Sequence, residues 1–235
     1  MARWGTQACT HHPTLGPRFS RATKGPLHER LLAARLYVIT PDQEPARLEA
    51  MAAAALRGGA DVLQLRHKLL ARGDLLLLAR RLRELTRAAG ALFIVNDHLD
   101  LALLSDADGV HLGPDDLSVA GARRVAGARL LIGASASFPS NAVEAIESGA
   151  DYIGCGPAFA TPLKPNKVVI GPAGVAEVTR AVGPAVPVFA IGGIDASNLG
   201  QLTAAGLRRA CVVRAVGDAP DPEAAALRLR AMLDA

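Results

Sequence analysis

Polar side chains interrupt an apolar run in the stretch 61–68, which reads DVLQLRHK. The run begins as a buried β-strand would, yet Gln64, Arg66 and Lys68 fall on alternate positions and therefore project from one face of a strand. Arginine and lysine side chains in such a position can bind anionic groups such as phosphates. Either this face meets water, or the chain assembles polar side chains around a ligand.

Acidic and amide side chains follow the next two apolar runs. Asn96 and Asp97 end the first of them, and Asp115 and Asp116 follow the second. Each pair alone could serve as a helix cap. Carboxylates from neighbouring strands can also share a hard cation, and Mg2+ usually takes one or two carboxylates together with substrate phosphate. Taken together, the two acidic pairs favour a magnesium site over two helix caps.

Two further features are typical of phosphate binding. The adjacent Gly192 and Gly193 could form a simple turn, but glycines also let backbone N–H groups approach an anion closely. Lys164, in the stretch ATPLKPNK, could be a solvated loop lysine. With Arg66 and Lys68 it would complete a cationic cluster facing the acids, which is the electrostatic arrangement of a metal-bound diphosphate.

A repeating scaffold would have to position these side chains, and one pattern recurs from about residue 35 onward. A short apolar run rich in β-formers is followed by a polar or glycine loop and then by an Ala-, Leu- and Arg-rich stretch with helical spacing. Strands are predicted at 36–40, 62–66, 92–97, 109–113, 130–135, 152–157, 186–193 and 210–215. Helices are predicted at roughly 44–58, 73–89, 98–105, 118–126, 139–148, 172–182, 196–205 and 221–233.

The constant strand–helix order predicts parallel strands with right-handed crossovers. Eight such units in about 200 residues close into an α/β fold of the (β/α)8 TIM-barrel type. A doubly wound open sheet is the alternative, but no GxGxxG follows the first strand. Active-site groups of these barrels lie at the carboxyl ends of the strands. The polar residues expected to meet at that rim are Gln64, Arg66, Lys68, Asn96, Asp97, Asp115, Asp116, Ser135, Thr161, Lys164, Gly192, Gly193 and Arg214.

Length and composition limit the class of protein. The 235 residues suit one barrel domain, predicted at 35–235, after a disordered or extended tail at 1–34. An aromatic content of 3% and a net charge of +4 without a basic stripe argue against nucleic-acid binding. No apolar run approaches the roughly 18 residues that span a bilayer, so no membrane partner is expected. The three cysteines are too far apart to suggest disulfides or zinc, and a cytoplasmic location is expected.

Three reactive residues inside the predicted strands are given structural roles. Cys155 and Cys211 lie within apolar strands and are predicted to be core thiols. His111, inside GVHLG, is predicted to be a hydrogen-bonded barrel residue and not a catalyst.

Seven motifs, in order and with consistent spacing, give the chain a family resemblance. They are QLRHK, VNDHLDLAL, DGVHLGPDDL, IGAS, ADYIGCGPAFATPLKP, FAIGGI and ACVVRAV. Over about residues 36–216 the chain resembles thiamine-phosphate synthase. The resemblance implies a (β/α)8 transferase that uses Mg2+ to join 4-amino-5-hydroxymethyl-2-methylpyrimidine diphosphate to 4-methyl-5-(2-phosphoethyl)thiazole. The products would be thiamine monophosphate and pyrophosphate, the partners small molecules, and a homo-oligomer stays open.

The resemblance also assigns roles to particular residues. It implies that the metal is held by Asp97 and Asp116, and that Lys164, Arg66 and Ser135 are catalytic. The implied ligands of the pyrimidine diphosphate are Gln64, Arg66, Lys68, Asn96, Ser135 and Lys164. The implied ligands of the thiazole phosphate are Thr161, Leu163, Gly193, Val213 and Arg214. No protein nucleophile is required, because charge on the leaving diphosphate is neutralised by cations while the thiazole nitrogen attacks the pyrimidine methylene.

Four positions depart from the family pattern. Pro114 stands in place of a common Gln, Ser137 in place of a His, Leu163 in place of the second Thr of a TxTK loop, and Arg214 in place of a Ser. We hypothesise that Arg214 compensates for Leu163 by supplying a charge-assisted phosphate contact. Two alternatives are a thiazole tautomerase-like paralogue and a catalytically inactive precursor-binding regulator, since a fold alone specifies no activity.

Overall fold

Eight parallel strands form a closed barrel in the computed structural model, which describes residues 25–162 and 166–235. Neighbouring strands pair in chain order, and pairing of Leu36 with Ala210 joins the last strand to the first. The strands are β1 (Leu36–Ile39), β2 (Val62–Leu65), β3 (Leu92–Asn96), β4 (Gly109–Leu112), β5 (Leu131–Ala136), β6 (Tyr152–Cys155), β7 (Val188–Ile191) and β8 (Ala210–Val212). The predicted TIM barrel is confirmed, and the open-sheet alternative is wrong.

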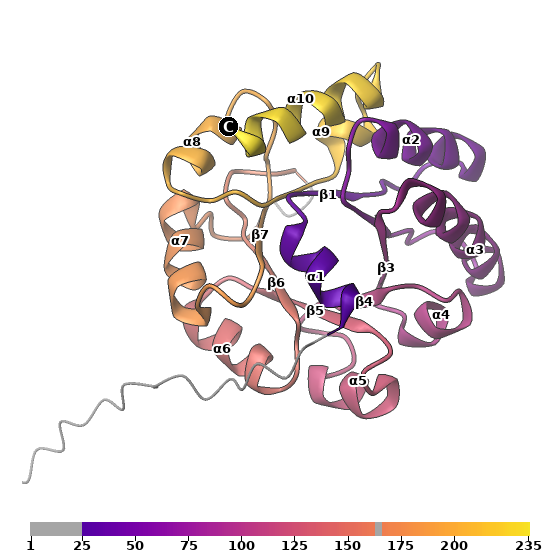
Figure 1. Ribbon diagram of the computed structural model, residues 1–235, viewed down its shortest axis with the longest axis horizontal. Helices are drawn as coiled ribbons and strands as arrows, with labels where there is room; N and C mark the ends of the chain where they lie inside the picture. The colour runs from indigo at the N-terminus through magenta and orange to yellow at the C-terminus, as the bar shows by residue number, and fades with distance from the viewer. Residues whose placement is uncertain (1–24, 163–165) are drawn as a thin grey trace, which may run out of the picture.

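A ring of helices surrounds the strands (Figure 1). Each predicted helix is present: α2 (Pro45–Arg57), α3 (Arg72–Ala89), α4 (Leu99–Leu104), α5 (Val119–Ala126), α6 (Pro139–Glu147), α7 (Gly171–Val182), α8 (Leu199–Ala204) and α10 (Pro222–Asp234). Local side chains define several starts, since Glu44, Ser118 and Asp221 each accept a bond from a backbone N–H in the first turn. Within the described ranges, no helix is long and apolar enough to cross a membrane.

Most of the predicted strands end earlier than the sequence pattern suggested, and the seventh and eighth differ most from their predicted ranges. The seventh was predicted at 186–193, but Pro187 cannot donate to a sheet, and Gly192 and Gly193 have φ of 102° and 62°, so β7 is confined to Val188–Ile191. The eighth was predicted at 210–215, but β8 ends at Val212. A four-residue helix, α9 (Arg214–Gly217), follows it and was not predicted.

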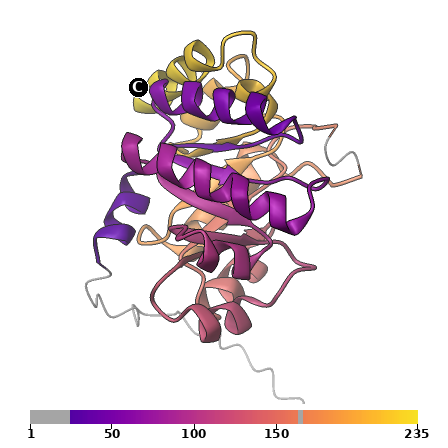
Figure 2. The same cartoon turned by 90° about the vertical axis from the view of Figure 1, so that its right-hand side faces the viewer.

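The predicted tail at 1–34 is corrected for its last part, because Pro26–Ala33 form helix α1. The helix crosses the opening of the barrel in Figure 1 and lies at one end of it in Figure 2. Its Leu31 is fully buried among the side chains that fill the barrel interior. Burial of one leucine stabilises by about 2 kcal/mol, which favours a short amphipathic helix over an extended tail.

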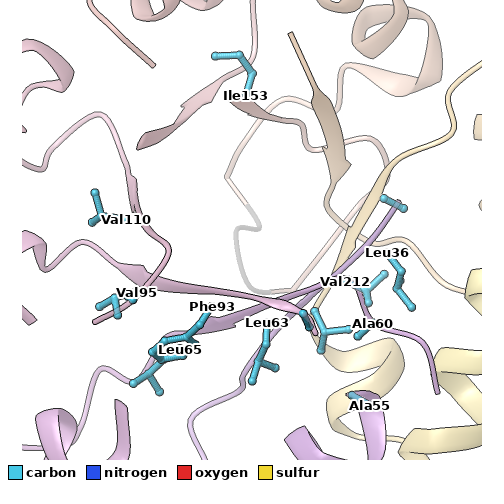
Figure 3. Close-up of a cluster of buried hydrophobic side chains, with 14 of the residues drawn as sticks. Leu36, Ala55, Ala60, Leu63, Leu65, Phe93, Val95, Val110, Ile153 and Val212 are labelled. Atoms are coloured by element: carbon cyan, nitrogen blue, oxygen red, sulfur yellow. The ribbon is translucent and has the colours of Figure 1, made fainter. Parts of the chain in front are cut away.

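Alternation along the strands divides the core into two layers. Outward-facing residues such as Leu63, Leu65 and Phe93 pack beneath the helices (Figure 3). Inward-facing residues fill the barrel, where the rings of Tyr37 and Phe189 meet edge-on with centroids 5.3 Å apart. Although the chain has few aromatic residues, it concentrates several of them in this interior and so fills the barrel with large side chains.

One carboxylate arrangement recurs at the amino-terminal ends of the strands. An Asp just before an even-numbered strand accepts backbone N–H bonds at the start of the preceding odd-numbered strand, as Asp61 does from Leu36, Asp108 from Phe93 and Asp151 from Ile132. Each Asp is also paired with an arginine from a surrounding helix. This face of the barrel is therefore built for stability, at the end opposite the predicted site.

The Asp108 carboxylate gives a direct test of that role. It is 6% exposed and accepts bonds from the Phe93 backbone N–H and from Arg83 Nη1, at 2.8 and 2.9 Å. Asp108→Ala leaves the partly buried guanidinium of Arg83 and a buried backbone donor unpaired, so we expect a loss of about 3 kcal/mol in unfolding free energy. Urea denaturation measures the unfolding free energy, and substitution of an exposed helix residue, Glu177→Ala, is the control. Equal stability of the two variants would contradict the assigned role.

Candidate functional site

A cavity of about 690 Å³ opens at the carboxyl ends of the strands. Side chains or backbone from β2, β3, β5, β7, β8 and the loop after β6 contribute to its walls. The sequence-predicted residues that line it are Gln64, Arg66, Asn96, Ser135, Thr161, Gly192, Gly193, Val213 and Arg214. The barrel thus brings together residues that are 150 positions apart in the chain, and the volume is in the range of small-molecule sites.

A smaller hollow of about 240 Å³ shares part of this wall. Arg66 and Asn96 line both spaces, whereas Lys68 and Asp97 line only the smaller one. The prediction that one strand face carries Gln64, Arg66 and Lys68 is wrong. Strand β2 ends at Leu65, so Arg66 and Lys68 belong to the following turn. Leu163 and Lys164 lie outside the described residues.

Asp42 holds the turn that carries the two cations and was not singled out from sequence. Its Oδ1 accepts a 2.6 Å bond from the backbone N–H of Lys68, and its Oδ2 lies 3.3 Å from Arg66 Nη1. The buried Thr40 hydroxyl both accepts from the Arg66 N–H and donates to the Arg66 carbonyl. The end of β1 thereby fixes the cationic turn after β2, a contact between elements that no local pattern predicts.

His67 contributes to the same turn as a structural residue. Its Nδ1 accepts a 3.1 Å bond from the Leu70 backbone N–H. Its Nε2 lies 2.9 Å from the Gln43 carbonyl, which requires that nitrogen to carry the proton. The imidazole between the two cations in QLRHK therefore orders the loop from within and leaves Arg66 and Lys68 to face the hollows.

Asp97 and Asp116 form a close carboxyl pair beside these cations. Burial raises the pKa of Asp97 to about 6, assisted by a hydrogen bond with Asp116 and by the charge of that group, while Lys68 and Arg66 oppose the rise. Asp116 Oδ2 also accepts a 2.7 Å bond from the backbone N–H of Gly113. Two carboxyl groups this close repel each other when both are ionised, and a bound divalent cation offsets that repulsion.

The helix-cap alternative for these acids is wrong. The residue at the start of α4 is His98, which makes no side-chain capping bond. Helix α5 is capped by Ser118, whose hydroxyl accepts from the Gly121 N–H. Asp97 instead has a left-handed backbone, with φ of 63°, an unusual conformation for a residue other than glycine. Among the described residues, no group of three or more His, Cys, Asp or Glu side chains lies close enough together to hold a metal.

Gly192 and Gly193 allow the end of β7 to meet the loop after β6. A Cβ on Gly193 would lie 2.3 Å from the Ala160 carbonyl oxygen, and one on Gly192 would lie 2.6 Å from Pro157 Cβ. The Phe159 N–H donates to the Gly192 carbonyl across this contact. The turn predicted from sequence is present, and close packing as well as positive φ requires both glycines.

A chain of hydrogen bonds runs through the barrel interior to the main cavity. Gln64 Nε2 donates to Tyr37 Oη at 2.7 Å, and Tyr37 Oη lies 3.0 Å from Tyr152 Oη. The chain continues over 3.3 Å to His111 Nδ1 and over 3.0 Å from His111 Nε2 to Ser135 Oγ. His111 is hydrogen-bonded in the barrel as predicted, and it also lines the cavity.

The two cysteines predicted to be core thiols are free and buried. Burial raises the pKa of the Cys155 thiol to about 12 and that of Cys211 further still. Both groups therefore stay protonated and uncharged near neutral pH. Phe138 and Lys167 also line the main cavity and were not predicted from sequence, because neither lies in a strand.

A family model described as thiamine monophosphate synthase matches residues 36–216. The chain belongs to the thiamine monophosphate synthase family. Thiamine-phosphate synthase from Gloeobacter violaceus is 48% identical over 203 residues, 86% of this chain and 58% of that protein. A family member from Chloroflexus aurantiacus is 45% identical over 203 residues, 85% of this chain and 92% of that protein.

The fold of a solved family member agrees with that of this chain. The structure of thiamine phosphate pyrophosphorylase from Pyrococcus furiosus has a TM-score of 0.78 and 36% identity, covering 88% of this chain and 98% of that one. The chain spans little more than half the length of several curated family members it matches, those from Gloeobacter violaceus, Synechocystis, Thermosynechococcus vestitus and Nostoc. The described barrel corresponds to the shared part.

Proposed function

We propose that the protein joins 4-amino-5-hydroxymethyl-2-methylpyrimidine diphosphate to 4-methyl-5-(2-phosphoethyl)thiazole, releasing pyrophosphate and forming thiamine monophosphate. The observation that carries the proposal is the carboxyl pair of Asp97 and Asp116 beside Arg66 and Lys68, at the edge of a cavity large enough for small molecules. Cations and paired acids are the groups that a metal-bound diphosphate requires. Family membership supports the same reading.

The residues fit a bound Mg2+ with few protein ligands. Asp97 and Asp116 would hold it, and diphosphate oxygens and water would complete its coordination. When bound, the metal would neutralise charge on the leaving diphosphate. Arg66, Lys68 and Lys164 would act on the same charge, and Gln64, Asn96 and Ser135 would orient the pyrimidine diphosphate. The role of Lys164 rests on the resemblance alone, whereas the roles of the other residues rest on the resemblance and on their common rim.

The substitution itself needs no protein nucleophile. The bond between the pyrimidine methylene carbon and the diphosphate oxygen breaks, and its electron pair leaves with the diphosphate. The aminopyrimidine stabilises the resulting cation, and the lone pair of the thiazole nitrogen then forms the new carbon–nitrogen bond. The protein supplies orientation and electrostatic stabilisation.

The thiazole phosphate is assigned to the wall formed by Thr161, Gly193, Val213 and Arg214. The resemblance adds Leu163, which lies outside the described residues. The ends of β7 and β8 meet there, and the short helix α9 follows β8, as in the usual phosphate site of these barrels. Arg214 is exposed and lines the cavity, so its guanidinium is available for a charge-assisted phosphate contact.

Arg214→Ala tests the proposal that this residue compensates for Leu163. We expect the KM for the thiazole phosphate to rise about tenfold with kcat nearly unchanged, because a phosphate remote from the reacting atoms is bound equally in ground and transition states. Steady-state kinetics with each substrate varied in turn measures the effect. Arg228→Ala, on the exposed face of α10, is the control. An unchanged KM would contradict the proposal.

The function is tested by mixing purified protein with both substrates and Mg2+ and following thiamine monophosphate together with pyrophosphate. Formation of the two products in equal amounts is expected. No turnover with diphosphate binding retained would instead favour the inactive precursor-binding regulator. A cytoplasmic location and a homo-oligomeric assembly are further proposals, which fractionation of cells and light scattering of the purified protein would test.

A further inference from the structure

Buried hydroxyl groups connect two strands whose side chains line the main cavity, β2 and β5. Gln64 and Ser135 both line the cavity, and they are connected through Tyr37, Tyr152 and His111. Both tyrosines are at most 2% exposed. Buried polar groups satisfied in this way form networks whose bonds strengthen one another.

The amide of Gln64 sets the donor-to-acceptor direction of this series of hydrogen bonds. An amide nitrogen can only donate, so Tyr37 Oη accepts from Gln64 Nε2 and directs its own proton to Tyr152 Oη. Tyr152 then directs its proton to His111 Nδ1. Burial raises the pKa of both tyrosine hydroxyls, so each keeps the proton it donates.

The tautomer of His111 determines which way its hydrogen bond with Ser135 runs. An imidazole that accepts at Nδ1 and is neutral carries its proton on Nε2. That Nε2–H donates to Ser135 Oγ, 3.0 Å away. The hydroxyl proton of Ser135 is then left to donate into the cavity. If every hydrogen bond of the series ran in the opposite direction, Ser135 would donate to His111. It would then present only lone pairs to the cavity, and these repel an anion.

Two strand glycines leave space for the hydrogen-bonded side chains of Tyr152 and His111. A Cβ on Gly133 would lie 2.1 Å from the Tyr152 ring and 2.6 Å from His111 Nδ1, and one on Gly154 would lie 3.1 Å from His111 Cε1. Glycine weakens a strand interior, and its presence marks a close approach. Because a side chain on Gly133 would collide with both partners, the contact between Tyr152 and His111 depends on that glycine.

We propose that Tyr37 and Tyr152 are positioning residues that hold His111 in its Nε2–H tautomer and thereby make Ser135 a hydrogen-bond donor to an anionic group of the ligand. Resting on the proposed function, that group is the diphosphate, while the amide oxygen of Gln64 accepts from the aminopyrimidine. A donor at Gln64 polarises its amide and strengthens every bond toward Ser135. Binding of the aminopyrimidine thus favours diphosphate binding.

The tautomer is measured directly by ring-nitrogen NMR of protein labelled with 15N-histidine. We expect His111 in the neutral Nε2–H form, with His67 as an internal reference for that tautomer and His111→Asn to assign the signal. A neutral Nδ1–H form or a protonated ring at pH 7.5 would overturn the proposal. This measurement needs no turnover, so it stands even if the proposed function fails.

A double-mutant cycle tests how Tyr152 acts. We expect Tyr152→Phe to lower kcat about fivefold without changing the KM for the thiazole phosphate, and the double variant with Ser135→Ala to be no slower than Ser135→Ala alone. Ser105→Ala, which removes a buried hydroxyl that donates to the Leu101 carbonyl, is the control and should leave kcat unchanged. Additive effects of the two substitutions would mean that Tyr152 does not act through Ser135. If Tyr152→Phe does not fold, the wild-type tautomer decides the proposal alone.

Discussion

Asp97→Asn should lower kcat at least 100-fold while making the protein more stable in the absence of Mg2+. The rate falls because one of two carboxylates proposed to hold the metal is lost, and removal of one electrostatic contact to a developing charge costs about 100- to 1,000-fold. Asparagine tolerates the left-handed backbone that Asp97 adopts, so the fold is preserved. Steady-state kinetics at saturating substrates measures the rate.

The sign of the stability change follows from the pKa of Asp97. That pKa is raised from 3.8 to about 6, so folded protein holds a proton that unfolded protein releases between these values. Stability from this site is present below pH 4 and lost as the pH rises through 6. At pH 8 the neutral amide of Asp97→Asn escapes the repulsion by Asp116. Because the site is half-buried, solvent screening limits the gain to about 1 kcal/mol.

Thermal unfolding separates this prediction from a simple loss of function. At pH 8 without metal, Asp97→Asn should unfold about 3 °C above wild type, and near pH 4 the two should coincide. Added Mg2+ should stabilise wild type and have little effect on the variant. Asp106→Asn is a matched control, since Asp106 also has positive φ and lies after α4, away from the cavity. A variant with wild-type turnover, or one less stable than wild type at pH 8, would contradict the assignment.

Arg66→Ala should lower kcat about 100-fold and weaken binding of pyrophosphate with Mg2+. Its guanidinium lines both hollows and lies beside the carboxyl pair, where it is proposed to neutralise the leaving group. Arg66→Lys should recover only part of the rate, because an ammonium cannot reproduce a bidentate contact with phosphate oxygens. Kinetics and calorimetric titration with pyrophosphate measure the two effects.

Arg57→Ala is the control for this substitution. Arg57 is also paired with a carboxylate, at 2.7 Å from Glu223, but on the exposed helical surface. Its loss should leave kcat unchanged and cost less than 1 kcal/mol in stability. If Arg66→Ala bound pyrophosphate as tightly as Arg57→Ala does, Arg66 could not be a ligand of the diphosphate.

Local sequence patterns predicted most of the elements that carry the site. The run around Leu63 and the residues around Asn96 are apolar, β-rich and followed by helical spacing, and such patterns depend only on near neighbours in the chain. The parallel order then places every strand end on one rim, so Ser135 and Arg214 could be assigned to one cavity although they are distant in sequence.

Helix α1 shows where local patterns fail. Pro26–Ala33 is short and near the chain terminus, so periodicity alone gave no reason to expect order. The helix forms because Leu31 finds the open end of the barrel, which exists only once eight strands have closed. Local patterns also failed to predict α9. The pattern ACVVRA is typical of a strand over its whole length, yet β8 ends at Val212 and α9 begins at Arg214.

Sequence by itself determined the barrel, the rim and the types of side chain that meet there, because these follow from periodicity and from the fixed direction of parallel strands. Only the tertiary structure decided which groups touch: the pairing of Asp97 with Asp116, the bond from Asp42 to the cationic turn, and the contact of Tyr152 with His111. Contacts between side chains of different strands depend on the register and closure of the barrel to within an ångström or so, which no local pattern encodes.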